Sequence, residues 1–326
     1  MADDKPQAAP QAEAPLVAFE GREPPAPDWF KWAIAQEPER SFVNVGGANI
    51  ELLAWGERGK PGMMLIHGNS AHADWWSFIA PYLAKDFRVA AISLSGMGAS
   101  DWRENYSFEV FAQEMHAGAE AAGLYDAPVK PIFIGHSFGG SQVFYAARKY
   151  PQWMQAAILV DTGFGGPPPA AEGFRQPQTR TQPNRVDPTL EAALGRFRFM
   201  PPQGCSNFFI ADFIARRSLK RAPMEDGGEG WTWRFDPFLW GKLDRTAMAS
   251  IVLEPSWCPM IHIYGANSVI VKRRQDHDSP ADNLLNTLKQ VVIPDSEHHV
   301  MVDQPLALVS ALRGVLSYWP EGGIAR

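Results

Sequence analysis

The sequence has little cysteine, no basic run and no long hydrophobic segment. Only Cys205 and Cys258 occur among 326 residues, and they form no CxxC pair, so the sequence suggests neither a disulfide framework nor a thiolate zinc site. A reducing compartment such as the cytoplasm fits this scarcity. Lys and Arg number 30 against 36 Asp and Glu, and the net charge is −6, so we do not expect a nucleic-acid partner.

No apolar stretch reaches membrane-spanning length, so we expect no membrane partner, and no internal repeat is visible. Residues 1–40 are rich in Ala, Pro and acidic residues and lack the apolar core of a secretory signal. This composition predicts an N-terminal arm, 1–40, whose first ~15 residues are poorly ordered. The remaining chain is long enough to form one large domain with an insertion.

From about Ser41, short apolar runs alternate with stretches of helical periodicity. The runs predict eight strands, the first two forming a hairpin, near 41–45, 49–55, 63–67, 89–93, 131–135, 157–161, 259–264 and 290–293. The intervening periodicity predicts helices near 74–84, 107–123, 138–150, 281–288 and 305–318. This alternation is typical of an α/β fold, a mostly parallel sheet covered by helices on both faces.

One region interrupts the alternation and predicts an inserted, largely helical cap over residues 163–246, leaving 41–162 and 247–326 as the core. It begins with a Pro- and Gly-rich stretch and is then rich in aromatic residues. These rings either line an apolar substrate pocket or pack the cap onto the core. Phe164, Phe209 and Trp240, together with Trp76 of the core, are the candidate substrate-binding residues.

The most informative segment is Gly135-His136-Ser137-Phe138-Gly139-Gly140, which joins a predicted strand to a predicted helix. Gly-x-Ser-x-Gly in this context is the nucleophile elbow, a strained turn that exposes a serine hydroxyl next to a helix N-terminus. Glycines flank the serine because a β-carbon there would clash with neighbouring backbone. Ser137 is therefore the candidate nucleophile.

With this motif the chain resembles the α/β-hydrolase fold family over roughly residues 42–319. "MMLIHGNSAHADWW" is similar to the family's His-Gly loop, which implies that the Asn69 amide contributes to an oxyanion hole, with the Phe138 amide as second donor. "ISLSGMGASDW" resembles the family's Gly-x-Gly-x-Ser turn. The family usually has an acidic residue where Ser93 stands, and we assign this departure to the scaffold.

The segment "IPDSEHHVMVDQP" carries the candidate base. In the family the histidine lies five positions before an acidic residue that precedes x-Pro, and Asp303 minus five is His298. The adjacent His299 is the alternative. We expect His67 and His136 to be turn and packing residues, and the histidines show no metal-ligand spacing, so neither a metal nor a cofactor is expected.

The third member of a triad is harder to assign. The family most often supplies its acid at Gly-x-x-Asp after the penultimate strand, but Gly265 plus three is Ser268. Some branches carry the acid at the end of the strand that follows the elbow helix, which makes Asp161 our candidate. Asp276, Asp278 or a triad without an acid are the alternatives.

The resemblance implies a serine hydrolase that cleaves a small, hydrophobic ester or lactone through an acyl-enzyme. A nucleophilic serine argues against epoxide hydrolases and haloalkane dehalogenases of this fold, which attack with a carboxylate. A carbon-carbon bond hydrolase, a perhydrolase or a cofactor-free oxygenase stay open. So do a small-ligand-binding protein and an interaction protein that uses the Pro-rich arm. The oligomeric state, a homodimer included, is also open.

Overall fold

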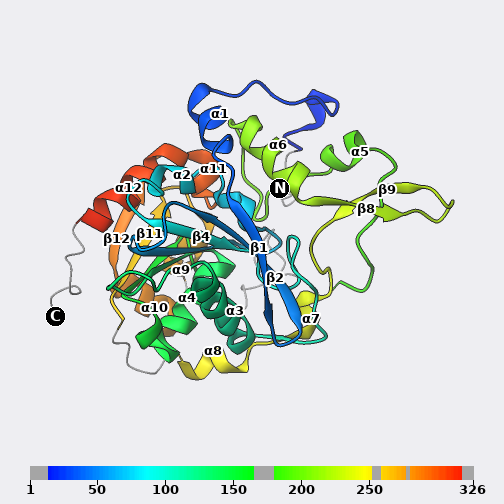
Figure 1. The fold of residues 1–326 in the computed structure, drawn as a ribbon. Helices are drawn as coiled ribbons and strands as arrows, with labels where there is room; N and C mark the ends of the chain where they lie inside the picture. The colour runs from blue at the N-terminus through cyan, green and yellow to red at the C-terminus, as the bar shows by residue number, and fades with distance from the viewer. Residues whose placement is uncertain (1–13, 165–179, 252–257, 277–279, 318–326) are drawn as a thin grey trace, which may run out of the picture.

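The centre of the protein is an eight-stranded sheet (Figure 1), seen in a computed structural model that describes residues 14–164, 180–251, 258–276 and 280–317. The strand order is β1-β2-β4-β3-β6-β7-β11-β12, and only the β1/β2 and β2/β4 pairs are antiparallel. The strands are β1 (Glu39–Val45), β2 (Ala48–Trp55), β3 (Gly62–Ile66), β4 (Arg88–Ile92), β6 (Ile132–His136), β7 (Ala156–Val160), β11 (Met260–Gly265) and β12 (Lys289–Ile293). The predicted fold class is confirmed, and every predicted strand is present.

Helices cover both faces of the sheet and bury two hydrophobic clusters. One cluster contains residues of α1 (Asp28–Ile34), α2 (Ala80–Leu83), α6 (Phe208–Arg217) and α12 (Pro305–Ser317). The other contains residues of α3 (Phe108–Ala121), α4 (Phe138–Lys149) and α10 (Pro280–Thr287). Fully apolar central strands are expected where both faces are covered. Among the described residues, no helix combines the length and the apolarity needed to cross a bilayer.

Two predicted segments differ from the structure. The helix expected over 74–84 is divided into a 3-10 turn, η2 (Ala73–Trp76), and the short α2, with Pro81 in the first turn of α2. In the predicted arm, α1 packs against α6, because the rings of Trp29 and Phe30 contact Phe209. Residues 1–13, where we expected poor order, lie outside the described residues.

The region between β7 and β11 contains helices and also strands. Its elements are α5 (Leu190–Leu194), α6, β8 (Leu219–Pro223), β9 (Glu229–Trp233), α7 (Leu239–Lys242), β10 (Leu243–Asp244) and α8 (Thr246–Ile251). Strands β8 and β9 form an antiparallel hairpin that we did not predict from the sequence. Its turn contains Gly227 at φ +85°, and the Asp226 carboxylate accepts from the Gly228 amide. The cap boundaries at 163 and 246 stay a prediction.

The carboxyl edge of the parallel strands brings together loops that are far apart in the sequence. Ser137 follows β6, Asp161 follows β7, Ser268 follows β11 and His298 follows β12. The loop after β3 begins at His67 on the same edge. In open α/β sheets this is the edge where ligands bind, so the fold places the candidate nucleophile, base and acid at one edge.

We expect Gly135→Ala to destabilise the protein by about 1–3 kcal/mol or more, since overpacking against rigid backbone has that effect. A β-carbon at Gly135 would lie 2.4 Å from the Gly139 carbonyl oxygen. Urea unfolding would measure the change. Gly314→Ala on α12 is the matched control, because nothing lies within 4 Å of a β-carbon there, and alanine should stabilise that helix by about 0.5–1 kcal/mol. Equal effects of the two substitutions would contradict the steric argument.

Candidate active site

Ser137 lies on the sharp turn between β6 and α4, with φ 53° and ψ −116°. Positive φ is unfavourable for a residue with a β-carbon, so the surrounding backbone must hold it in place. A β-carbon at Gly139 would lie 2.3 Å from the His67 carbonyl oxygen, and one at Gly140 would lie 1.8 Å from Thr162 Oγ1. The glycines that flank the serine are therefore required by close packing, as the motif predicts.

The imidazole of His298 lies between Ser137 and Asp161. Its Nε2 is 2.9 Å from Ser137 Oγ, and its Nδ1 is 2.8 Å from Asp161 Oδ1. His298 and Asp161 are buried, whereas Ser137 is half-buried. If Nδ1–H donates to the carboxylate, the Nε2 lone pair faces the serine hydroxyl, which is the arrangement of a nucleophile, a base and an orienting acid.

The carboxylate of Asp161 has further donors. Ser268 Oγ donates to Asp161 Oδ1 at 2.6 Å, and the Gly265 amide donates to Oδ2 at 2.9 Å. Ser268, at the position where the family usually has its acid, thus donates a hydrogen bond to Asp161, our candidate acid. Of the alternative acids, Asp276 ends helix α9 (Val269–Asp276), and Asp278 lies outside the described residues.

The two predicted oxyanion donors, the backbone amides of Asn69 and Phe138, belong to segments that adjoin the serine. Phe138 is the first residue of α4, and a β-carbon at Gly68 would lie 3.4 Å from Ser137 Cβ, so the loop after β3 approaches the serine closely. Within the described ranges, neither amide has a protein acceptor. Free amides next to a nucleophile and at a helix N-terminus can stabilise an oxyanion.

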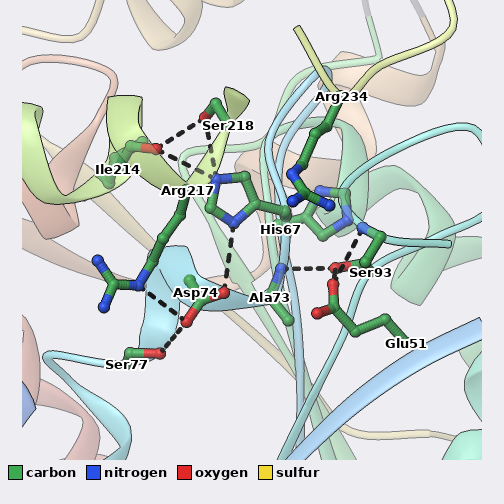
Figure 2. A network of polar contacts seen from close by, with 12 residues as sticks. Glu51, His67, Ala73, Asp74, Ser77, Ser93, Ile214, Arg217, Ser218 and Arg234 are labelled. Carbon is green, nitrogen blue, oxygen red and sulfur yellow. Dashed lines mark hydrogen bonds and ion pairs between the residues drawn. The ribbon is translucent and has the colours of Figure 1, made fainter. Parts of the chain in front are cut away.

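A buried polar network supports the loop after β3 (Figure 2). His72 Nε2 is 2.9 Å from Ser218 Oγ at the end of α6, and the Asp74 carboxylate pairs with Arg217 at 3.5 Å. Burial lowers the pKa of His72, which favours the neutral ring. Burial alone would raise the pKa of Asp74, but the charge and hydrogen bonds of Arg40 and the charge of Arg217 lower it below its usual value.

Ser93, the departure noted in the sequence, belongs to the same network. Its hydroxyl donates to Glu51 Oε2 at 2.7 Å and accepts from the Ala73 amide at 2.9 Å. It therefore joins strand β2 to the loop that carries Asn69.

The loop that carries His298 is held by the region between β7 and β11. Gln203 Nε2 donates to Asp303 Oδ1 at 2.9 Å, and Gln203 Oε1 accepts from the His299 amide at 2.8 Å. The Glu297 amide donates to Asp303 Oδ2 at 2.7 Å. Burial, reinforced by the Glu297 charge, raises the pKa of Asp303 to about 6.

Three histidines form a cluster that the sequence spacing did not reveal. His136, His298 and His299 are all buried, and one ligand nitrogen from each lies within 4.8 Å of the other two. Burial lowers the pKa of His136 to about 3 and the pKa of His299 well below its usual value. Imidazole nitrogens in this arrangement could hold a transition-metal ion, although we expected no metal site from the histidines.

The four predicted substrate-binding aromatics are dispersed. Trp240 contacts the Phe138 ring at 5.6 Å and lies near the site, but Phe164 packs on Phe144 at 4.3 Å. Phe209 packs on α1, and Trp76 is fully buried in the core. For Phe209 and Trp76 the structure therefore favours the packing role.

Two aromatic residues that were not among the predicted substrate-binding residues lie beside the histidine cluster. The rings of Trp75 and Phe199 contact His299 at 5.4 Å and 5.1 Å. Trp75 and Trp76 are neighbours on a 3-10 turn and point in different directions, which their sequence does not distinguish.

The model of the Alpha/beta hydrolase family matches residues 63–312, which include every residue of the Ser137, His298 and Asp161 constellation. The chain belongs to this family.

Several named relatives are distant, and the two that follow span most of the chain. Methylesterase 2 of Arabidopsis thaliana is 25% identical over 68% of this chain and 90% of its own length. Esterase Rv0045c of Mycobacterium tuberculosis is 26% identical over 86% of this chain and 89% of its own. The solved thioesterase domain from the curacin biosynthetic pathway superimposes with a TM-score of 0.63 at 22% identity, covering 85% of this chain and 99% of that domain.

We expect the stability of the protein to depend on Asp303 between pH 4 and 6. The pKa of Asp303 is raised from 3.8 to about 6 in the folded protein, so folding is favoured by its proton. The stabilisation by this proton is complete at pH values below the pKa of Asp303 in the unfolded chain. It is lost as the pH rises through the pKa of Asp303 in the folded protein. Thermal unfolding across pH 3.5–7.5 should show wild type losing stability relative to Asp303→Asn over this window. Parallel curves would contradict the assignment.

Proposed function

We propose that the protein is a serine hydrolase that cleaves a small, hydrophobic carboxylic ester or lactone. The observation that carries the proposal is the continuous chain of contacts from Ser137 through His298 to Asp161, with distances of 2.9 and 2.8 Å. Esterase names among the relatives support the reaction class. The aromatic rings of Trp75, Phe199 and Trp240 around the site support a hydrophobic substrate.

In the proposed reaction, His298 Nε2 takes the proton of Ser137 as Oγ attacks the substrate carbonyl carbon. The amides of Asn69 and Phe138 donate to the oxyanion of the tetrahedral intermediate. The intermediate collapses as His298 returns the proton to the leaving alcohol, or to the ring-opened alcohol of a lactone. His298 then deprotonates a water that attacks the acyl-enzyme, and the carboxylic acid leaves.

Asp161 orients His298 and stabilises its protonated form in this reaction. The binding-protein alternative depended on a serine at the family's usual acid position. Because Ser268 donates to Asp161, that serine is consistent with a complete triad, and the catalytic proposal is favoured. Carbon-carbon bond hydrolysis, perhydrolysis and cofactor-free oxygenation use similar constellations, and a substrate panel separates them from ester hydrolysis.

We also propose the cytoplasm as the location, since the presence of only two cysteines among 326 residues fits a reducing compartment.

The first test is covalent labelling of the serine. A fluorophosphonate should form a single adduct on the Ser137 peptide, detected by mass spectrometry, because His298 activates this hydroxyl. Ser137→Ala and His298→Ala should remove the adduct, whereas Ser310→Ala, on the exposed face of α12, should not. Absence of an adduct on folded wild-type protein would overturn the hydrolase proposal.

The second test concerns the acid. Asp161→Asn should lower kcat for p-nitrophenyl butyrate by roughly 10³- to 10⁴-fold, the range for a triad whose histidine loses its orienting carboxylate. Ser268→Ala should lower it by about 10-fold, because one hydrogen bond to a charged group contributes about 1.5 kcal/mol. Unchanged turnover in Asp161→Asn would exclude this residue as the acid, and Ser310→Ala again serves as the matched control.

A further inference from the structure

Three imidazoles share one buried space beside the catalytic serine. One nitrogen each from His136, His298 and His299 lies within 4.8 Å of the other two. Zinc-bound imidazole nitrogens lie about 2.0–2.1 Å from the metal, so two of them in a tetrahedral site are about 3.4 Å apart. The cluster therefore needs a contraction of at most ~1.4 Å to bind an ion.

Two of the rings already have the hydrogen bonds typical of metal ligands. A metal-binding histidine usually donates its other ring N–H to a carboxylate or a backbone carbonyl, which orients the ring. His136 Nε2 is 3.0 Å from the His298 carbonyl oxygen, and His298 Nδ1 is 2.8 Å from Asp161 Oδ1. Asp161 also supplies negative charge close to the cluster.

The remaining nitrogens have no partner among the described residues. His136 Nδ1 and both nitrogens of His299 are buried and make no hydrogen bond. The Met200 carbonyl lies close to His299 without a hydrogen bond of ordinary geometry. Buried polar atoms without partners are unusual and are destabilising. Gly68 packs closely against His136 Nδ1, because a β-carbon there would lie 2.9 Å from it, so the lack of a side chain keeps this nitrogen uncovered by one.

We propose that His136, His298 and His299 form a binding site for a divalent transition-metal ion such as Zn²⁺, and that the bound ion inhibits the enzyme. Three imidazoles suit zinc, copper or nickel rather than magnesium or calcium, which prefer oxygen ligands. Three protein ligands leave a fourth position for water. Ser137, whose Oγ lies 2.9 Å from His298 Nε2, is half-buried rather than fully enclosed.

Inhibition follows from the position of His298 in the site. Its Nε2 contacts Ser137 and its Nδ1 contacts Asp161, so a metal on either nitrogen breaks one of these two contacts. A metal-bound imidazole nitrogen also has no lone pair with which to accept a proton. The inhibitory effect rests on the proposed hydrolase function, whereas the binding site itself does not.

Binding is tested without catalysis by calorimetric titration of Zn²⁺ into full-length Ser137→Ala protein. We expect one ion per chain, and no binding of Mg²⁺. Adding His299→Phe should weaken zinc binding by about 100-fold or more. Even the loss of a residue that only hydrogen-bonds to a metal ligand lowers metal affinity by about 10–100-fold. His299→Gln is the second variant, should phenylalanine disturb folding.

His116 provides the matched control, because it is a partly exposed histidine on α3 that stacks on Trp153 and lies 3.7 Å from Glu120. His116→Phe should leave zinc binding unchanged. Equal affinities of the His299 and His116 variants, or no zinc binding to the Ser137→Ala protein, would overturn the proposal.

The inhibitory effect is measured as fluorophosphonate labelling of wild type with and without Zn²⁺. Zinc should slow labelling, EDTA should restore it, and His299→Phe should need about 100-fold more zinc for the same fractional slowing. If labelling is absent without zinc while calorimetry still shows one bound ion, the hydrolase proposal fails and the metal site stands. If zinc binds without slowing the labelling, the inhibitory part is overturned.

Discussion

The buried carboxylate of Asp161 is the group on which the geometry of the site depends. A charge removed from water must be compensated by hydrogen bonds, and Asp161 is fully buried. Its donors are Gly265 at the end of β11, Ser268 after β11 and the ring of His298 after β12. Satisfying this one group therefore brings the ends of three strands, β7, β11 and β12, to fixed positions, and it orients the imidazole towards Ser137 at the same time.

The sequence predicts the sheet well because buried parallel strands appear as short apolar runs with turn residues at their ends. The hairpin β8–β9 was missed for a related reason, since only β9 alternates clearly and its partner β8 is mostly exposed, with burial only at Leu219. The helix expected over 74–84 failed because Pro81 favours a new helix start. Local patterns therefore predict elements whose faces are fully buried better than elements at the periphery.

For the site as well, local sequence patterns predicted some residues, whereas others depend on contacts that only the fold creates. Ser137 and His298 lie in motifs whose spacing is local, and Asp161 was chosen from its place at a strand end. The histidine cluster could not be predicted in this way, because His136 is 162 residues from His298 and they meet only where the loop after β12 reaches the end of β6, across β7 and β11. The sequence also does not show which way an aromatic ring points. Trp75 contacts His299, whereas its neighbour Trp76 is fully enclosed in the core.

The segment from Gln203 to Ser218 contacts both loops that carry catalytic groups. Gln203 binds the His299 amide and Asp303, and Ser218 binds His72 in the loop after β3. Separating this segment from the core would leave buried polar groups without partners on both sides, at about 1–3 kcal/mol for each. Substrate entry that required this separation would be opposed by the sum of these costs. The segment is therefore better understood as a fixed wall between the two loops, which in the proposed reaction would align His298 with the Asn69 and Phe138 amides.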